Sequence, residues 1–554
     1  MSLAPSAPPR GARSDQAVEL PRAGASADAA CRSRLLSCTV LAVVAAATLL
    51  TQCRLVGFQP GHHGWVTAHG LAIISNATAD SGWLGYTARL RSASGEASYY
   101  YFDRYPVVFS AAMHSLLQFA GEPGADQIFL ARQLMNLIFL ATLVAGYLLV
   151  RLLIADRLAA LAATLLCFSG YYCIYYKDMV HFDQPAVLGF VVLLYAVSWQ
   201  FVRGRSRWVY AAGLFAVLLG RGYASFAILA VWIGIDLLGV LRERPRENLL
   251  AGVLRSDAVR VSCVCFIVAT SALAYNIATE SRITGAAWYE TSIVSSAQRR
   301  LGFEASFDRQ IADDLTWGRF AERQIKQLAR SVTPYAVSRE AGMSKTVRRV
   351  IQFVLAGTLV YLLVNTWRTA DPQRQKIFAL LVLSGFVWMI PMRRLTYFHD
   401  YTTLYYLGLS LALFAALAGR VAARRAPSLL AAALVVFALS LVLVRQDENS
   451  VARQVNPTTR DFDRIRPLLA DTDAVCVAGG PFSLSPEVRY DVAYYVSPLW
   501  LSALAVEPYV LTRNRDHAGQ NLTPENSEVF LFRQSSRGLA ASGQTRQATL
   551  IGAQ

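Results

Sequence analysis

The sequence predicts an all-α polytopic membrane protein with about eleven transmembrane helices, followed by a small C-terminal extracytoplasmic α/β domain. Three observations predict this fold class. Hydrophobic residues make up 54% of the 554 residues and charged residues 16%, whereas a soluble protein carries about 25% charged residues. The apolar residues form runs long enough to cross roughly 30 Å of hydrocarbon. Basic residues concentrate at alternate ends of these runs, which is typical of a chain that crosses a membrane repeatedly.

The composition also excludes other classes of protein. A soluble enzyme, a coiled coil, a disordered chain and a disulfide-rich secreted domain all need more polar residues or a different cysteine pattern. The formal net charge of +16 is explained by basic residues beside the apolar runs. We therefore expect no nucleic-acid partner, because no aromatic stacking platform accompanies the basic residues.

The apolar runs number about eleven, and they give the predicted transmembrane spans. They cover residues 35–52, 128–150, 158–174, 185–201, 208–220, 223–241, 258–277, 350–367, 376–392, 402–419 and 427–445. The fifth and sixth runs are nearly continuous, so the chain is expected to turn sharply around Gly220–Gly222, where glycine permits unusual backbone angles.

Charge asymmetry predicts the orientation. Residues 1–34 are rich in Ala, Ser, Pro and Arg and are expected to be a disordered cytoplasmic tail. An inside N-terminus places sixteen basic and five acidic residues in the inner loops, in agreement with the positive-inside rule. Residues 35–445 then form the membrane domain, with outer loops 53–127 and 278–349. Residues 446–554 form the outer soluble domain, with a helix over 461–470 and strands over 474–478 and 529–532.

All seven histidines fall on the predicted outer side, which indicates that any chemistry faces outward. The first outer loop carries His62 and His63, and later an acid beside a base, Asp103 and Arg104, before Tyr105-Pro106. Either this pair is a salt bridge that anchors an interfacial helix starting after Pro106, or Arg104 receives an anionic group and Asp103 orients it.

A second cluster follows the third span. Residues 175–185 read Tyr-Tyr-Lys-Asp-Met-Val-His-Phe-Asp-Gln-Pro and place Lys177, Asp178 and Asp183 at the mouth of two apolar spans. Asp183 precedes Pro185 and suits the N-terminus of the next helix. The alternative to this capping role is a carboxylate at the membrane edge that meets substrate.

Further basic residues break the positive-inside trend. Arg221 stands between two glycines, and Arg393 and Arg394 precede His399 at the outer end of a late span. Arginine binds phosphate through two parallel hydrogen bonds, so lipid phosphate is a natural partner. The alternatives are headgroup contact by Arg221 and charge compensation of the arginine pair by Asp400. We expect Arg104 and Arg221 to meet at one outward-facing cavity with Lys177 or Arg393.

The order of these motifs resembles the polytopic C-type glycosyltransferases, in particular the branch of family 39, protein O-mannosyltransferases and lipid A aminoarabinose transferases. Phe102-Asp103-Arg104-Tyr105-Pro106 is similar to the family's aromatic–acid–base–proline stretch. Asp183 resembles the family's carboxylate after the third span, and Gly220-Arg221-Gly222 its turn between the fifth and sixth spans. Residues 397–401 resemble the stretch that opens a late span. The resemblance covers about residues 35–420.

This resemblance implies a sugar transfer from a polyprenyl-phosphate donor to a glycan, lipid or protein acceptor on the outer face of a bacterial inner membrane. The chain departs from the family where an early acidic pair is usual, because it has His62-His63 there. The base is therefore Asp183, His63 or Asp103. Asp183 is favoured, with Asp103 orienting Arg104. Lys177, Asp178, Arg221, Arg393, Arg394, His399 and His62 complete the expected substrate and phosphate site.

No cofactor is expected, although His62, His63 and His69 offer the ligand type that zinc prefers, which leaves a divalent metal open. Two other functions remain alternatives. A transporter or flippase would show pseudo-symmetric halves with broken helices, and no internal repeat is evident. A non-catalytic binder of lipid-linked sugars is the second, suggested by the missing acidic pair.

Overall fold

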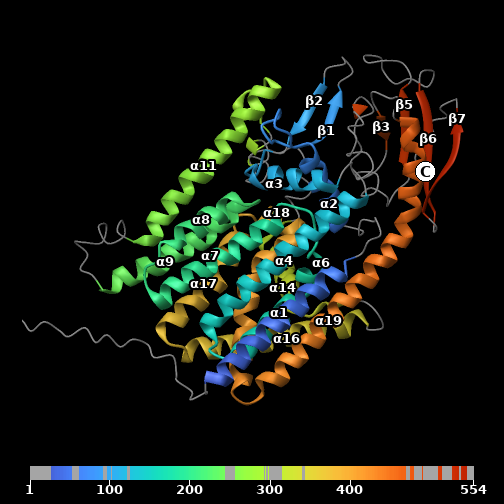
Figure 1. Ribbon diagram of the computed structural model, residues 1–554. Helices are drawn as coiled ribbons and strands as arrows, with labels where there is room; N and C mark the ends of the chain where they lie inside the picture. Colours follow the sequence, from blue (N-terminus) through green and yellow to red (C-terminus); the bar gives the residue numbers. More distant parts are fainter. Residues whose placement is uncertain are drawn as a thin grey trace, which may run out of the picture.

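The computed structural model describes most of the chain as helices gathered into one elongated bundle, with a sheet near one end (Figure 1). The described residues are 27–52, 62–91, 97–101, 103–120, 125–243, 256–291, 293–294, 297, 315–339, 344–469, 475–478, 489–490, 509–514, 527–535 and 538–545.

Eight of the described helical segments are long and apolar enough to cross a membrane. They are Cys31–Leu50, Asp126–Leu153, Asp183–Arg203, Gly222–Leu241, Asp257–Thr284, Lys345–Thr369, Asp400–Val421 and Arg425–Asn449. They coincide with eight of the predicted spans, so the chain is a multi-pass membrane protein.

The other three predicted spans also coincide with helices, but these are shorter or less apolar. Residues 158–174 cover α5 (Arg157–Phe168) and α6 (Tyr171–Tyr175), and residues 208–220 cover α8 (Trp208–Leu218). Residues 376–392 overlap α17 (Pro372–Met389). The total of about eleven spans stays a prediction.

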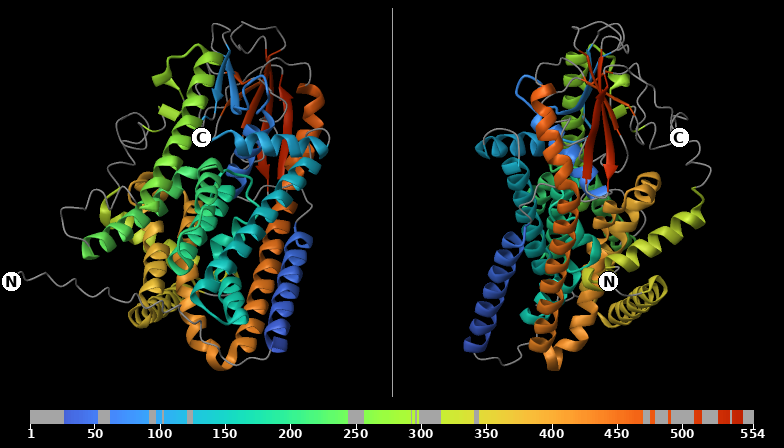
Figure 2. Two further views of the ribbon diagram at one scale, coloured as in Figure 1. Left: turned by 60° about the vertical axis from the view of Figure 1, so that its left-hand side comes forward. Right: turned by 90° about the vertical axis from the view of Figure 1, so that its right-hand side faces the viewer.

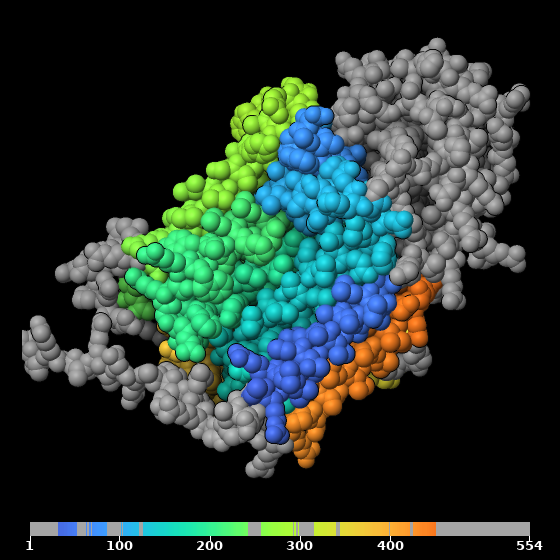
Figure 3. Space-filling model, viewed as in Figure 1, coloured from blue at the N-terminus to red at the C-terminus, as the bar shows by residue number. Residues whose placement is uncertain are grey.

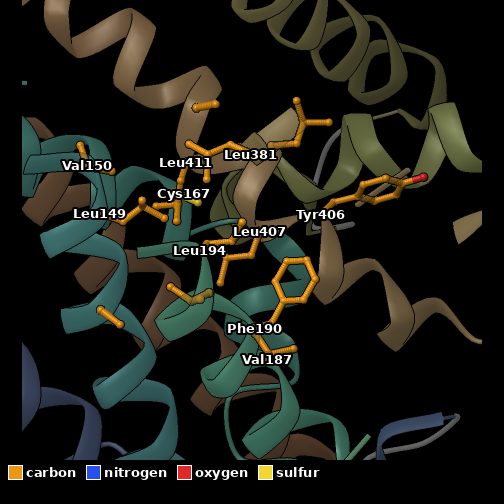
Figure 4. Close-up of a cluster of buried hydrophobic side chains, with 14 of the residues drawn as sticks. Leu149, Val150, Cys167, Val187, Phe190, Leu194, Leu381, Tyr406, Leu407 and Leu411 are labelled. Atoms are coloured by element: carbon orange, nitrogen blue, oxygen red, sulfur yellow. The ribbon is translucent and has the colours of Figure 1, made fainter. Parts of the chain in front are cut away.

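The bundle core is built by α4 (Ala125–Leu153), α5, α7 (Asp183–Arg203), α17 and the first part of α19 (Leu407–Leu469). Figure 4 shows Leu149, Cys167, Phe190, Leu381 and Leu411 from these five helices pointing into one cluster. Close packing of such side chains holds the helices in register, because lipid supplies no hydrophobic drive for their association.

The peripheral helices expose large apolar side chains. Leu50 of α1 (Ala27–Leu50) is 78% exposed, Phe266 of α11 (Asp257–Thr284) 62%, and Val354 of α16 (Lys345–Thr369) 62%. Figure 3 shows α1 on the surface of the bundle. Such exposed apolar surface is expected where lipid, and not water, surrounds the helix.

A seven-stranded sheet lies near one end of the bundle, with strand order β2-β1-β4-β3-β5-β6-β7 (Figure 2). β1 (Tyr86–Arg91) and β2 (Ala97–Tyr101) come from the first outer loop. The remaining strands come from the C-terminal segment: β3 (Val475–Ala478), β4 (Arg489–Tyr490), β5 (Tyr509–Asn514), β6 (Ser527–Ser535) and β7 (Gly538–Thr545). β4 pairs antiparallel with β1 and so joins the two segments.

α19 kinks at Arg425, where the backbone leaves helical angles, and then continues to Leu469. It therefore runs through the predicted boundary at residue 446 and includes the helix expected over 461–470. The strands expected over 474–478 and 529–532 correspond to β3 and part of β6. A separate C-terminal domain with that boundary stays a prediction.

The structure also contains shorter helices. They are α2 (His62–Ser75), α3 (Val108–Leu117), η1 (Gln118–Ala120), η2 (Gly222–Ser225), η4 (Trp288–Glu290), α14 (Trp317–Ser331), α15 (Tyr335–Ser338), α18 (Arg393–Phe398) and η5 (Asp400–Tyr406). α3 begins just after Pro106, as the sequence predicted. One more long helix of the bundle is α9 (Phe226–Glu243).

Candidate functional site

The first charged cluster centres on Asp178, which follows α6. Arg132 of α4 approaches Oδ2 of Asp178 with Nε at 2.7 Å and Nη2 at 2.5 Å. His63 of α2 places Nε2 3.2 Å from Oδ1. Glu448 of α19 lies 3.5 Å from Nζ of Lys177 and 3.4 Å from Nη2 of Arg132. Four segments that are distant in sequence therefore meet in one buried network.

The charges in this network compensate one another. Burial alone would raise the pKa of the Asp178 carboxyl, but the charges of Arg132 and Lys177 and the contact with His63 outweigh it and hold this pKa well below its usual range. The carboxylate is thus ionised, and it accepts a further hydrogen bond from Nε2 of Gln52 at 3.0 Å. Buried ions are tolerated when paired in this way.

The second cluster centres on Asp183, the first residue of α7. Arg221 places Nη1 3.1 Å from Oδ1 of Asp183, and Tyr405 donates its hydroxyl to the same oxygen at 3.0 Å. Nδ1 of His181 lies 2.6 Å from Oδ2. Arg221 also donates to the hydroxyl of Tyr105 from Nε at 2.9 Å and Nη2 at 2.6 Å. Tyr105 is the neighbour of Arg104 in the chain, which places the Arg104 segment beside Arg221.

A glycine turn brings Arg221 to Asp183. Gly220 has φ +52°, a left-handed conformation that favours glycine, and a Cβ there would lie 1.9 Å from the carbonyl oxygen of Phe182. The amide of Arg221 donates to this same oxygen at 3.2 Å. The sharp turn predicted at Gly220–Gly222 is confirmed. It packs the connection between α8 and η2 against the start of α7.

The contact between His181 and Asp183 determines which tautomer the imidazole adopts. An ionised carboxylate can accept hydrogen bonds but cannot donate them, so Nδ1 of His181 carries the proton that it shares with Asp183. Nε2 is then the basic nitrogen of the ring. A carboxylate that orients an imidazole in this way is a common arrangement in general-base catalysis.

Aromatic side chains connect the two clusters. Tyr176 stacks on His63 at a centroid distance of 5.8 Å, and its hydroxyl donates to Asp400 at 2.5 Å. The next residue, Tyr401, has its ring 5.6 Å from that of His181 and 5.6 Å from the guanidinium carbon of Arg221. Burial and the Asp400 carboxylate raise the pKa of Tyr176, so its hydroxyl stays protonated and remains a donor.

Two predicted residues of the first outer loop lie nearby. Asp103 is fully buried, and its backbone carbonyl accepts a hydrogen bond from Asn276 of α11 at 2.8 Å. The positive charge of Arg104 affects the pKa of His69 in α2. Burial, followed by the charges of His181 and Arg104, lowers the pKa of His69 from 6.5 to about 3. The Arg104 segment therefore lies on the same side as the Asp183 cluster.

The remaining predicted residues lie in neighbouring elements. Arg393 and Arg394 open α18, and the guanidinium carbon of Arg393 lies 4.6 Å from the ring centre of Trp317. His399 follows α18, with its ring 5.1 Å from that of Tyr401. His62 begins α2. The structure thus brings Lys177, Asp178 and His63 together, and separately Asp183 and Arg221.

Within the part of the chain that the structure describes, no three His, Cys, Asp or Glu side chains are close enough to hold a metal ion.

Several members of these clusters were not among the predicted site residues. They are Gln52, Tyr105, His181, Tyr405 and Glu448. Glu448 offered one signal, because it stands three residues after the apolar run 427–445, close to the membrane edge, where an acid is costly without a partner. His181 offered another, because it stands two residues before Asp183.

Two of the solved structures that are similar to the chain are described here. No protein-family model and no curated protein matches the chain. The oligosaccharyltransferase AglB from Archaeoglobus fulgidus, in complex with an inhibitory peptide and a dolichol-phosphate, is 13% identical with a TM-score of 0.39. The match covers 74% of this chain and 56% of AglB, so the chain spans a little over half of that protein. ArnT from Cupriavidus metallidurans, bound to undecaprenyl phosphate, is 14% identical with a TM-score of 0.40, over 94% of this chain and 99% of ArnT.

Proposed function

We propose that the chain is an integral membrane glycosyltransferase that moves a sugar from a polyprenyl-phosphate donor to a glycan, lipid or protein acceptor on the outer face of a bacterial inner membrane. The observation that carries this proposal is the Asp183 cluster, in which a buried carboxylate is held by Arg221, His181 and Tyr405 at the predicted outer edge of the membrane. It is costly to bury an ionisable group at this depth. Such groups therefore mark functional sites more often than they serve packing alone.

The reaction is an inverting displacement at the anomeric carbon. The acceptor oxygen forms a bond to this carbon while the bond from the carbon to the donor's phosphate oxygen breaks. The acceptor proton passes to a base on the protein, and the electron pair leaves with polyprenyl phosphate. Negative charge grows on that phosphate, so nearby cations stabilise the transition state. Arg104 and Arg221 are the first candidates, followed by Lys177, Arg393 and Arg394.

Asp183 acts together with His181 as the base. The ion pair with Arg221 makes the Asp183 carboxylate a weak proton acceptor by itself. Through the 2.6 Å contact with Nδ1, it orients the imidazole and stabilises the cation that forms when Nε2 takes up a proton. Asp103 orients Arg104, and His63 belongs to the Asp178 network. The packing of Tyr401 against both His181 and Arg221 supports one shared reaction centre.

The test uses membranes from cells that produce the chain, incubated with polyprenyl-phosphate carrying a radiolabelled sugar. Transfer appears as label in a product other than the donor lipid. Asp183→Asn should lower it at least about 100-fold. Asp236→Asn serves as a matched control, since Asp236 of α9 accepts a hydrogen bond from Ser256, which precedes α11, away from both clusters. Donor binding without any transfer would favour the non-catalytic binder. Solute export by proteoliposomes without a covalent product would favour a transporter.

Mass spectrometry of envelope glycans and glycolipids from cells lacking the chain would identify the acceptor.

A further inference from the structure

Tyr105 contacts Arg221 at two nitrogens. Both Nε and Nη2 of Arg221 donate to the Tyr105 hydroxyl, at 2.9 Å and 2.6 Å. These two nitrogens form one edge of the planar guanidinium, which arginine uses as a fork for carboxylate or phosphate. The guanidinium carbon also lies 5.4 Å from the ring centre of the tyrosine. A neutral side chain therefore occupies an edge of Arg221 that suits an anion.

The Asp183 carboxylate receives a different nitrogen of this guanidinium. Nη1 of Arg221 lies 3.1 Å from Oδ1 of Asp183, and within the described part of the chain it has no aligned hydrogen-bond acceptor. The contact is thus an ion pair through one nitrogen. Oδ1 also accepts the hydroxyl of Tyr405 at 3.0 Å, whereas Oδ2 lies 2.6 Å from Nδ1 of His181. The two carboxylate oxygens therefore have different partners.

The fork of Arg221 could bind the Asp183 carboxylate more strongly than this ion pair does. Two parallel N–H···O bonds align both donors with the carboxylate, so they are favoured over a single contact. Arg221 is 1% exposed and Asp183 0%, so water has little access to the fork. Without the Tyr105 hydroxyl, we expect the fork to turn toward Asp183 and to take Oδ2 from His181.

Asn276 of α11 holds the chain segment that carries Tyr105. Its Nδ2 donates to the backbone carbonyl oxygens of Asp103 and Tyr105, at 2.8 Å and 2.7 Å. Asn276 is fully buried in a helix that is long and apolar enough to span a membrane, where a polar side chain needs partners. The amide thus fixes the backbone on both sides of Arg104.

Aromatic packing fixes the ring of Tyr105 as well. Its centre lies 4.9 Å from that of Phe182, 6.1 Å from that of Tyr223 and 6.4 Å from that of His181. Tyr105 is 2% exposed. Its hydroxyl and its ring therefore face two different partners of the Asp183 carboxylate, and neither can move far without displacing a neighbour.

We propose that Tyr105 is a positioning residue of the reaction centre. Its hydroxyl occupies the fork of Arg221 and so prevents a bidentate pair with Asp183. Oδ2 of the carboxylate then stays with His181 and orients the imidazole. The effect on turnover rests on the proposed function, whereas the effect on His181 rests on the contacts alone. Arg221 keeps its charge beside the reaction centre in this arrangement.

The first measurement follows the protonation of His181 without any turnover. The full-length protein, with its histidines isotopically labelled at Cε1, is titrated by NMR in a neutral detergent. The resonance of His181 is identified by its loss in His181→Gln. In Tyr105→Phe the imidazolium loses the carboxylate that stabilises it, so the titration midpoint should move to lower pH by at least about 0.5.

Other ionisable groups lie around this imidazole. The titratable and charged groups near His181 and its partners are Asp183, Arg221, His69, Arg104, Tyr105 and Tyr401. Burial, followed by the charges of His181 and Arg104, lowers the pKa of His69 to about 3, so His69 stays neutral during the titration. A shifted midpoint in Tyr105→Phe therefore reports the change at the carboxylate.

The matched control is Tyr406→Phe. It also removes a buried hydroxyl, which donates to Oε1 of Gln324 at 3.1 Å and not to the Asp183 cluster. The midpoint of His181 should stay unchanged in this control. An unchanged midpoint in folded Tyr105→Phe, or an equal shift in the control, would overturn the proposal. Melting temperatures show which variants are folded.

Asn276→Leu gives a second test, which also applies if Tyr105→Phe does not fold. Leucine is similar in size to asparagine and suits a membrane-spanning helix, but it releases both backbone carbonyl oxygens. The Tyr105 segment then loses its anchor, so the midpoint of His181 should again move to lower pH. No shift in a folded Asn276→Leu would contradict the role of the segment in holding the fork.

A second arm measures sugar transfer by the same variants. Tyr105→Phe should lower kcat about tenfold and leave the KM for the donor nearly unchanged, because it misplaces the base without touching the donor. The acid side of the pH–rate profile should move to lower pH together with the midpoint of His181. A lower kcat with the wild-type profile would mean a merely structural role. If the wild-type chain transfers no sugar, the proposed function fails, and the midpoint of His181 still decides the role of Tyr105.

Discussion

Nε2 of His63 lies 3.2 Å from Oδ1 of Asp178, although 115 residues separate the two in the chain. An ionised carboxylate only accepts, so Nε2 of His63 donates its proton in this contact. A base must instead offer a lone pair. Both oxygens of Asp178 are engaged, by His63 on one side and by Arg132 and Gln52 on the other. This geometry favours Asp183 with His181 over His63 as the base.

We predict that Asp183→Asn lowers turnover at least about 100-fold, since a general base contributes about 10²–10⁴-fold in rate. His63→Ala should lower it less. The measurement is the initial rate of label transfer at saturating donor, together with donor binding, which should persist. Near-normal turnover in Asp183→Asn beside an inactive His63→Ala would transfer the role to His63.

His181→Gln should also lower turnover, by about 10²-fold, and should change its pH dependence. As the pH falls, the wild-type imidazole takes up a proton and can no longer accept one from the acceptor. The wild-type rate should therefore decline on the acid side, while the residual rate of the variant should be flat over the same range. A variant whose pH profile keeps the wild-type decline would argue against His181 as proton acceptor.

Removal of one partner from the Asp178 network should destabilise the fold. Arg132→Met leaves the fully buried Asp178 carboxylate without its nearest cation, and breaking a buried pair costs about 3–5 kcal/mol. The free energy of unfolding, followed by circular dichroism during titration with a denaturing detergent, measures this loss. The double variant Arg132→Met with Asp178→Leu should recover part of it. No recovery would mean that the two charges act independently.

The depressed pKa of His69 predicts a loss of stability in acid. Burial and the nearby charges lower this pKa from 6.5 to about 3, so the folded protein keeps the imidazole neutral where the unfolded chain protonates it. Below pH 6.5 the unfolded state binds the extra proton, and the free energy of unfolding falls with pH until about pH 3. His69→Gln should show a smaller decrease between neutral and mildly acidic pH. An unchanged pH dependence would contradict this prediction.

The predicted topology places the C-terminus outside. A reporter that is active only in the cytosol should be inactive when fused after Gln554, and one that is active only after export should be active. The reason is the excess of basic residues in the loops assigned to the inside. The reverse pattern would place the two charged clusters on the cytoplasmic side, where a polyprenyl-linked donor of the proposed kind would not meet them.

Local patterns in the sequence determined the class of protein and much of its helical layout. An apolar run of sufficient length crosses a membrane whatever its neighbours are, because every backbone group is satisfied within the helix. The start of α7 at Asp183, the turn at Gly220 and the helix after Pro106 follow from the preferences of single residues, and the structure has all three.

The tertiary structure determined which polar and charged side chains contact one another. Lys177 contacts Glu448, which is 271 residues away in the chain. The hydroxyl of Tyr176 donates to Asp400, which is 224 residues away. No spacing along the chain encodes such partners, because they depend on how the helices pack. The sequence by itself therefore determined the membrane class and the residue types at its predicted outer edge, and the packing of the bundle decided how they divide into two buried ion-paired clusters.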